Sequence, residues 1–192
     1  MAAFAVQDPD FETSVRRSFD DLTLMRTVGA RLHSVAPGEV EIDLPFRDDL
    51  TQHHGYLAGA VLTAIVDIAC GYAAMTLMPS GASVLTVEYK VNFLSPAQGD
   101  RMVARGRVVR PGRTLTVCSG DVTAIVGGNE KIVATMLATM ATVNRQDRDV
   151  PQRPTIVATA HGHPVASHQA SASSRKRWCF CRGVQATDGP AF

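Results

Sequence analysis

The residues best suited to chemistry lie in one apolar stretch, Leu57–Pro79, in which Asp67 is the only Asp, Glu, Lys, Arg or His. A carboxylate among apolar neighbours loses hydration, which raises its pKa and suits it to act as a general base or a nucleophile. The alternative is a structural role, in which Asp67 bonds to Thr63 one turn earlier or to a nearby backbone group. The side chains around Asp67 decide between the two.

A second feature lies eight residues before Asp67, where Gly59 stands between two alanines at the predicted start of a helix. The first N–H groups of a helix have no partners within it and carry a partial positive charge. A glycine lets a carbonyl oxygen approach them closely, so this segment is a candidate oxyanion hole. The alternative is that Gly59 and Gly55 are ordinary turn and packing glycines.

The spacing of these two residues favours a site shared between two chains. Eight residues at a rise of about 1.5 Å each place Asp67 about 12 Å from Gly59 along the helix axis. That is too far for both to act on one carbonyl group. Two such helices packed antiparallel about a two-fold axis bring Asp67 of one chain toward Gly59 of the other, so we expect at least a homodimer.

The apolar stretch could be a membrane span or a buried helix, because about 20 apolar residues can cross a bilayer. It is rich in Ala and Gly, has no Lys or Arg close to its ends, and is followed by strand-like sequence. These features favour a helix buried in a water-soluble domain, with no membrane partner.

Strand-like segments separated by turn sequences surround the predicted helix, and an amphipathic helix is predicted at Pro9–Met25. The last four strands are typical of an antiparallel meander. One curled sheet leaves one side of an all-apolar helix uncovered, which again favours a second copy. The predicted strands are Val28–Val35, Glu39–Pro45, Ser83–Phe93, Arg101–Arg110, Thr114–Ile125 and Lys131–Val143.

Composition excludes several classes of function. A formal net charge of +1 gives no reason to expect nucleic acid or an acidic membrane as the main partner. The N-terminus lacks the basic start and the apolar run of a secretory signal, and the four cysteines demand no disulfide, so we expect a cytoplasmic protein.

The chain divides into three predicted parts: a helical segment at 1–26, a folded domain at 27–144 and a low-complexity tail at 145–192. The tail has seven Lys and Arg against three Asp and Glu, a net charge of +4, and no lasting periodicity, so we expect it to be disordered. Its histidines and cysteines match no zinc-binding spacing, so we expect no metal site there; they are His161, His163, His168, Cys179 and Cys181.

Three segments resemble the hotdog-fold acyl-CoA thioesterases, in particular the PaaI-like family: QHHGYLAGAVLTAIVDIACGYAA, VLTVEYKVNFLSPAQGD and GRTLTVCSGDV. The resemblance covers about Phe19 to Val143. It implies an α+β hotdog fold, with a curved antiparallel sheet wrapped around a long central helix, in a homodimer or a tetramer. It also implies hydrolysis of an acyl-CoA thioester to a free acid and CoA, without a cofactor.

Carried over residue by residue, the resemblance makes Asp67 the general base or nucleophile and Gly59 the N–H donor to the thioester carbonyl. Gln52 matches a residue that helps place the thioester or the attacking water, and Thr86 matches one that can hold that water. The chain departs from the family at Ala58, where a histidine usually stands. His54, in the preceding loop, is the candidate to replace it.

The remaining candidates concern substrate binding. CoA phosphates favour Arg or Lys at the mouth of a site, and the alternative for such residues here is solvated charges at strand ends. The candidates for the phosphates are Lys90, Arg110 and Arg113; those for the loop and acyl pocket are His54, Gly55, Tyr56, Leu57 and Val61.

Two other functions remain open. A non-catalytic acyl-CoA-binding or regulatory protein of the same fold is favoured by Ala58 and opposed by the presence of Asp67. A dehydratase or hydratase of this fold typically needs a catalytic histidine in the helix region, and the helix has none.

Overall fold

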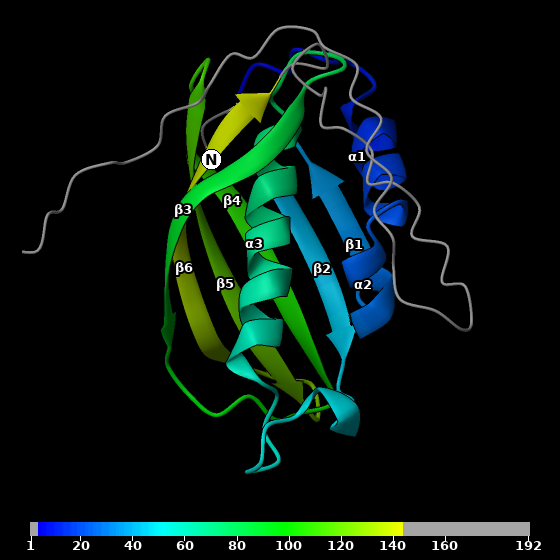
Figure 1. Ribbon diagram of the computed structural model, residues 1–192, viewed down its shortest axis with the longest axis vertical. Helices are drawn as coiled ribbons and strands as arrows, with labels where there is room; N and C mark the ends of the chain where they lie inside the picture. Colours follow the sequence, from blue (N-terminus) through cyan, green and yellow to red (C-terminus); the bar gives the residue numbers. More distant parts are fainter. Residues whose placement is uncertain (1–3, 144–192) are drawn as a thin grey trace, which may run out of the picture. The chain divides into compact units, whose positions relative to one another are not determined.

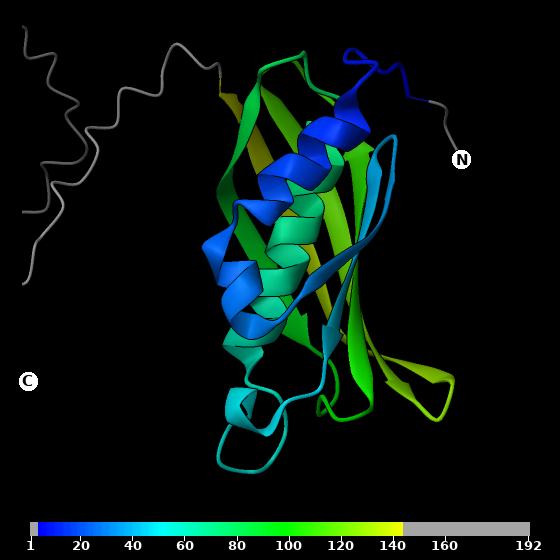
Figure 2. The same cartoon turned by 90° about the vertical axis from the view of Figure 1, so that its right-hand side faces the viewer.

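The computed structural model describes residues 4–143, which form helices on the inner side of one curved sheet (Figures 1 and 2). The predicted tail at 145–192, with its histidines and cysteines, lies outside the described residues. The helices are α1 Phe11–Asp20, α2 Thr23–Val28 and α3 Gly59–Met75, with a 3-10 turn, η1, at Asp48–Leu50. The strands are β1 Arg31–Ala36, β2 Glu39–Pro45, β3 Ser83–Phe93, β4 Arg101–Arg110, β5 Leu115–Val126 and β6 Asn129–Val143.

The six strands form one antiparallel sheet in the order β1-β2-β4-β5-β6-β3. Figure 1 shows the sheet curving around α3, which confirms the predicted hotdog architecture. β3 follows α3 in sequence but lies at the sheet edge, paired only with β6. The meander predicted for the last four strands is therefore confirmed only for β4, β5 and β6. Strand β3 lies beside α3, to which the hydrogen bond from Thr86 to Asp67 joins it.

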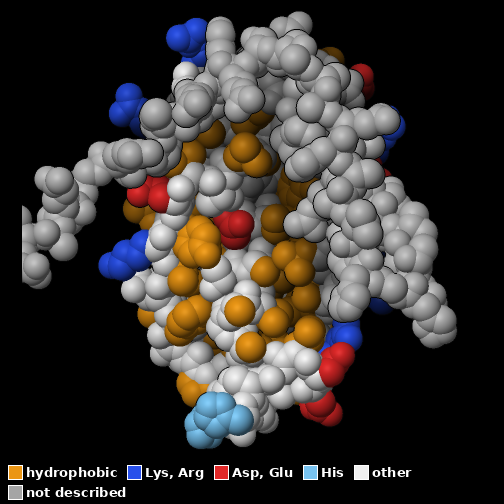
Figure 3. All heavy atoms as spheres, in the orientation of Figure 1, with side chains coloured by type: hydrophobic (Ala, Val, Ile, Leu, Met, Phe, Trp, Pro, Cys, Tyr) orange, Lys and Arg blue, Asp and Glu red, His pale blue; other side chains and the backbone are white. Residues whose placement is uncertain are grey.

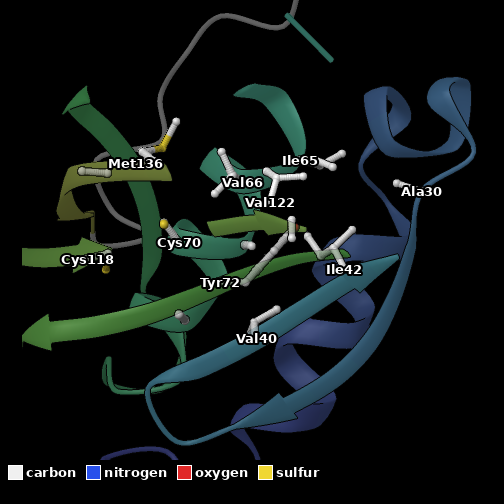
Figure 4. Packing of buried hydrophobic residues seen from close by; sticks show 14 of the residues in the cluster. Ala30, Val40, Ile42, Ile65, Val66, Cys70, Tyr72, Cys118, Val122 and Met136 are labelled. Atoms are coloured by element: carbon white, nitrogen blue, oxygen red, sulfur yellow. The ribbon is translucent and has the colours of Figure 1, made fainter. Parts of the chain in front are cut away.

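Apolar side chains from α3 and the inner face of the sheet form one core, part of which is shown in Figure 4. Ile42, Val66, Cys70 and Val122 are fully buried there. The sheet reaches the helix through alternate residues, because successive strand side chains point to opposite faces. No helix within residues 4–143 combines the length and apolar character that a membrane span requires.

Two glycines let the sheet approach α3 closely. Gly106 of β4 and Gly120 of β5 are cross-strand partners beneath the helix. A Cβ atom at Gly106 would lie 2.5 Å from the amide nitrogen of Cys70 and closer still to the Ala69 carbonyl. A Cβ at Gly120 would lie 2.5 Å from Val66 Cγ2. Backbone stands in the way at Gly106, so α3 cannot adjust there by turning a side chain.

We therefore expect Gly106→Ala to lower the free energy of unfolding by about 3 kcal/mol, the upper end for overpacking a core. Chemical denaturation would measure the loss. Ser119→Ala, on the outward face of β5, is the matched control and should change stability by less than about 0.5 kcal/mol. Equal losses in the two variants would show that the close approach to α3 carries no particular cost.

A β-bulge in β3 decides which of its side chains face α3. Register shifts between Thr86 and Glu88, so Val87 has no partner on β6. Thr86 pairs with Met140 and Phe93 with Ala134, both buried on the inner face. Because cross-strand partners share a face, Thr86 and Phe93 both point toward the helix side of the sheet.

The N-terminal helix differs from the one predicted. The single N-terminal helix expected at Pro9–Met25 is two helices, because Leu22 adopts an extended backbone and ends the run between α1 and α2. Helix α3 begins at Gly59, as predicted; Leu57, at the start of the apolar stretch, lies outside it because Leu57 pairs with Thr51 in an isolated bridge and donates its N–H to the carbonyl of Ala97 (2.9 Å).

Candidate active site

Asp67 lies on the side of α3 that faces β3. Its Oδ1 accepts a hydrogen bond from Thr86 Oγ1 at 2.8 Å. The predicted alternative partner, Thr63, instead donates to the carbonyl of Gly59 at 2.9 Å. Asp67 Oδ2 has no hydrogen-bond partner among residues 4–143, so it is available to a water or a substrate.

The surroundings of Asp67 disfavour its charge. Burial raises the pKa of the carboxyl above its ordinary value, and the hydrogen bond from Thr86 lowers it by a smaller amount. Figure 3 shows acidic atoms in the middle of a largely apolar face over α3 and β3. A carboxylate that is partly desolvated yet still accessible has the properties of a general base near neutral pH.

The N-terminus of α3 is the second part of the site. Ala58 is its N-cap and makes no side-chain capping bond; its carbonyl accepts the N–H groups of Val61 and Leu62. Within the described part of the chain, the N–H groups of Gly59 and Ala60 have no hydrogen-bond acceptor. Two unpaired donors at the positive end of a 17-residue helix suit a developing oxyanion.

A cavity of about 570 Å³ opens beside Gly59, the first of these two donors. None of its lining residues is charged, and three of the predicted residues, Gln52, Tyr56 and Leu57, line it together with Gly59. The remaining lining residues were not singled out from the sequence; they are Leu62, Phe93, Leu94, Ser95, Pro96 and Ala97. Leu62 belongs to α3, whereas the other five lie at the end of β3 or just after it and come close to Gly59 only when the sheet forms.

The polar loop before α3 holds its own side chains together. The Gln52 side-chain oxygen accepts the backbone N–H of His54. The rings of His53 and His54 are exposed, with centroids 4.0 Å apart. His54 makes no contact with Asp67 within this chain, so the structure brings Asp67 together with Thr86, and Gln52 together with Gly59, as two separate groups.

The other predicted residues lie elsewhere. Val61 packs against the core. Lys90 pairs with Leu137 on the outer face of the sheet, and Arg113 lines a different cavity near Leu77, at the far end of α3. Arg110 is exposed at the end of β4. Within one copy, the three predicted phosphate-binding cations therefore do not surround the cavity at Gly59.

The chain is similar to known thioesterases in both sequence and structure. Residues 54–130 match the family model described as the thioesterase superfamily. A thioesterase-family protein from Silicibacter pomeroyi is 46% identical, with a TM-score of 0.69 covering 70% of this chain and 98% of that one. Acyl-coenzyme A thioesterase 13 of Homo sapiens is 30% identical over 95 residues, which are 48% of this chain and 66% of that protein.

The PaaI protein of the E. coli phenylacetic acid degradation operon has a TM-score of 0.64 over 72% of this chain and 96% of that one. At 16% identity, this likeness supports the fold alone. The bacterial thioesterase-family structure carries more weight, because nearly half of its residues are identical across almost its whole length. With the matching family model, it shows that this chain belongs to the thioesterase superfamily and is a thioester hydrolase.

Proposed function

We propose that the protein hydrolyses acyl-CoA thioesters to a free acid and CoA, with Asp67 as the general base or nucleophile. One observation carries this proposal: a partly buried carboxylate of raised pKa, held at 2.8 Å by the Thr86 hydroxyl, with its second oxygen unpaired within the described residues. The similarity to acyl-coenzyme A thioesterase 13 supports CoA as the thiol.

In the proposed reaction, Asp67 Oδ2 takes a proton from water while the water oxygen bonds to the thioester carbon. The carbonyl oxygen becomes an oxyanion, which the Gly59 N–H stabilises. The carbon–sulfur bond then breaks, and Asp67 returns the proton to the CoA sulfur. Direct attack by Asp67 is the alternative: the carboxylate oxygen bonds to the thioester carbon, the carbon–sulfur bond breaks and CoA leaves as the thiolate. Water then hydrolyses the resulting mixed anhydride to the free acid and Asp67, and the proton released goes to the CoA thiolate.

We further propose that the site is completed in a homodimer. Asp67 and Gly59 of one helix are about 12 Å apart, so they cannot act on the same thioester. Asp67 would therefore act with Gly59 of a second copy, and Gly59 with Asp67 of that copy. The free edge of β3 and the apolar surface beside it offer the contact, because an unpaired strand edge readily pairs with another strand. The exposed apolar residues on and beside β3 are Leu85, Val87, Tyr89, Phe93 and Leu94.

A protein that binds acyl-CoA without hydrolysing it is the second candidate function. Ala58 supports it, because a histidine is usual at this position in the family that the sequence resembles. Thiol release measured over short, aromatic and long acyl-CoAs separates the two functions. Saturable release of CoA supports the hydrolase, whereas saturable binding in calorimetry without release of the thiol would identify the binding protein.

The acid limb of the pH–rate profile should report Asp67. Because the pKa of Asp67 is raised, kcat/KM should fall at a pH above the range of an ordinary carboxyl group, as the base is protonated. Thr86→Val removes the hydrogen bond that lowers this pKa, so the limb should move to higher pH. Thr63→Val is the control: Thr63 lies on the same helix as Asp67 but does not bond to it, so the limb should stay in place. A limb that moves to lower pH in Thr86→Val contradicts this assignment.

A further inference from the structure

The ring of Phe93 occupies the space that a side chain at Gly59 would need. A Cβ atom built at Gly59 would lie 2.9 Å from Phe93 Cζ and 3.2 and 3.3 Å from the two Cε atoms. Gly59 has a helical backbone and begins α3, so its conformation does not require glycine. The residue at position 59 must be small because the ring of Phe93 lies against it.

Phe93 is held in place by the sheet. It is the last residue of β3 and pairs with Ala134 of β6, and the backbone N–H groups of Leu94 and Ser95 both reach the Val133 carbonyl, at 2.8 and 3.4 Å. The bulge earlier in β3 turns the ring toward α3. The position of the ring is therefore set by strand pairing and not by a mobile loop.

The exposure of Phe93 shows that core packing does not explain its position. It is 53% exposed, although an inward-facing aromatic residue of a sheet is usually buried. The ring lines the uncharged cavity of about 570 Å³ at the start of α3, next to the apolar surface proposed as the dimer contact. A carbonyl oxygen bound by the Gly59 N–H would place the first carbon of its acyl chain in the same cavity.

We propose that Phe93 is a specificity-determining residue, whose ring forms the wall of the acyl site beside the Gly59 N–H and limits the width of the acyl group at its α-carbon. The inference rests on the proposed function, because it takes Gly59 as the carbonyl-binding donor. The ring leaves room for an unbranched CH₂ and excludes a methyl branch.

The test compares a straight-chain acyl-CoA with its 2-methyl-branched counterpart, at the chain length that the wild type hydrolyses fastest. Phe93→Ala should raise the branched-to-straight ratio of kcat/KM about tenfold, the usual effect of one methyl group in an apolar pocket. Leu137→Ala is the control: this apolar residue on the outer face of β6 is 56% exposed but does not line the cavity. Its ratio should stay at the wild-type value.

Gly59→Ala provides a second, independent measurement. The new methyl group displaces the Phe93 ring, so its cost in kcat/KM should be several-fold smaller in a Phe93→Ala background than in the wild type, a non-additivity expected of residues in contact. Additive effects, or an unchanged branched-to-straight ratio in Phe93→Ala, would overturn the role of Phe93 while leaving the hydrolase intact. A wild type that hydrolyses no acyl-CoA would overturn the proposed function, and this inference with it.

Discussion

Asp67→Asn should lower kcat for thioester hydrolysis about a thousandfold, within the range for loss of a general base. The carboxamide keeps the volume of the side chain and can still accept the hydrogen bond from Thr86, but it cannot take a proton from water or attack the thioester. Thiol release by the purified variant measures the effect. Thr86 and the cavity at Gly59 remain in place, so substrate binding should change much less than kcat.

The fold should tolerate this replacement. The pKa of Asp67 is raised in the folded protein, so its ionised form is less favourable there than in the unfolded chain, and at neutral pH the charge lowers stability. Removing it should leave the free energy of unfolding equal to or above that of the wild type. Stability that falls sharply would mean that Asp67 is structural after all.

Glu88→Gln is the matched control for Asp67→Asn. Glu88 lies two residues after Thr86 but on the outer face of β3, where it accepts a hydrogen bond from Thr139 at 3.1 Å. The same chemical change there should leave thioester hydrolysis at the wild-type rate. A folded Asp67→Asn variant that is as active as Glu88→Gln would refute the proposed mechanism.

Tyr89→Asp should separate the proposed dimer into monomers and lower kcat about a hundredfold, the usual loss when an oxyanion donor is removed. The new carboxylate would lie in the apolar surface of β3 that a second copy would bury, and burying an unpaired charge is costly. Light scattering coupled to size-exclusion chromatography reports the mass, and thiol release reports the activity. The mass and the activity of the variant should fall together as it is diluted.

Leu137→Asp is the control for this second prediction. Leu137 is 56% exposed on the outer face of β6, away from the proposed interface beside α3. It should keep both the dimer and the activity. A monomeric Tyr89→Asp variant with full activity would show that one chain contains a complete site.

Mixing two damaged chains tests the sharing of residues directly. Asp67→Asn keeps a normal Gly59, and Gly59→Ala keeps a normal Asp67. If each site takes one residue from each chain, a heterodimer of the two variants has one intact site, and activity should return when they are mixed and allowed to exchange. If both residues act within one chain, the mixture should be no more active than its components.

Much of the fold could be predicted because it follows from local patterns. The predicted strands Ser83–Phe93 and Arg101–Arg110 agree with β3 and β4, since turn residues mark their ends. The apolar run with Asp67 inside it predicted both a central helix and a candidate carboxylate, because apolar content and a single charge can be read without knowing the neighbours. The prediction that the site is shared between chains followed from helix geometry and stays a prediction.

The tertiary structure alone decided which residues meet. In β3, simple alternation from Thr86 would have turned Asn92 toward α3, and the bulge at Val87 instead turns Phe93 there. A bulge depends on pairing with β6, which lies more than 40 residues later, so it leaves no local signal. The partner of Asp67 is likewise Thr86, on a distant strand, and not Thr63, which lies one turn away in the same helix.

The sequence by itself determined the helix, the strands and the candidate base Asp67, because these depend on periodicity and on the types of neighbouring residues. Only the tertiary structure decided why Gly59 and Gly106 must be glycine. At Gly59 the constraint is the ring of Phe93, and at Gly106 it is the backbone of α3. Both constraints come from close contact between segments far apart in the sequence, which the chain forms only when the sheet closes around its helix.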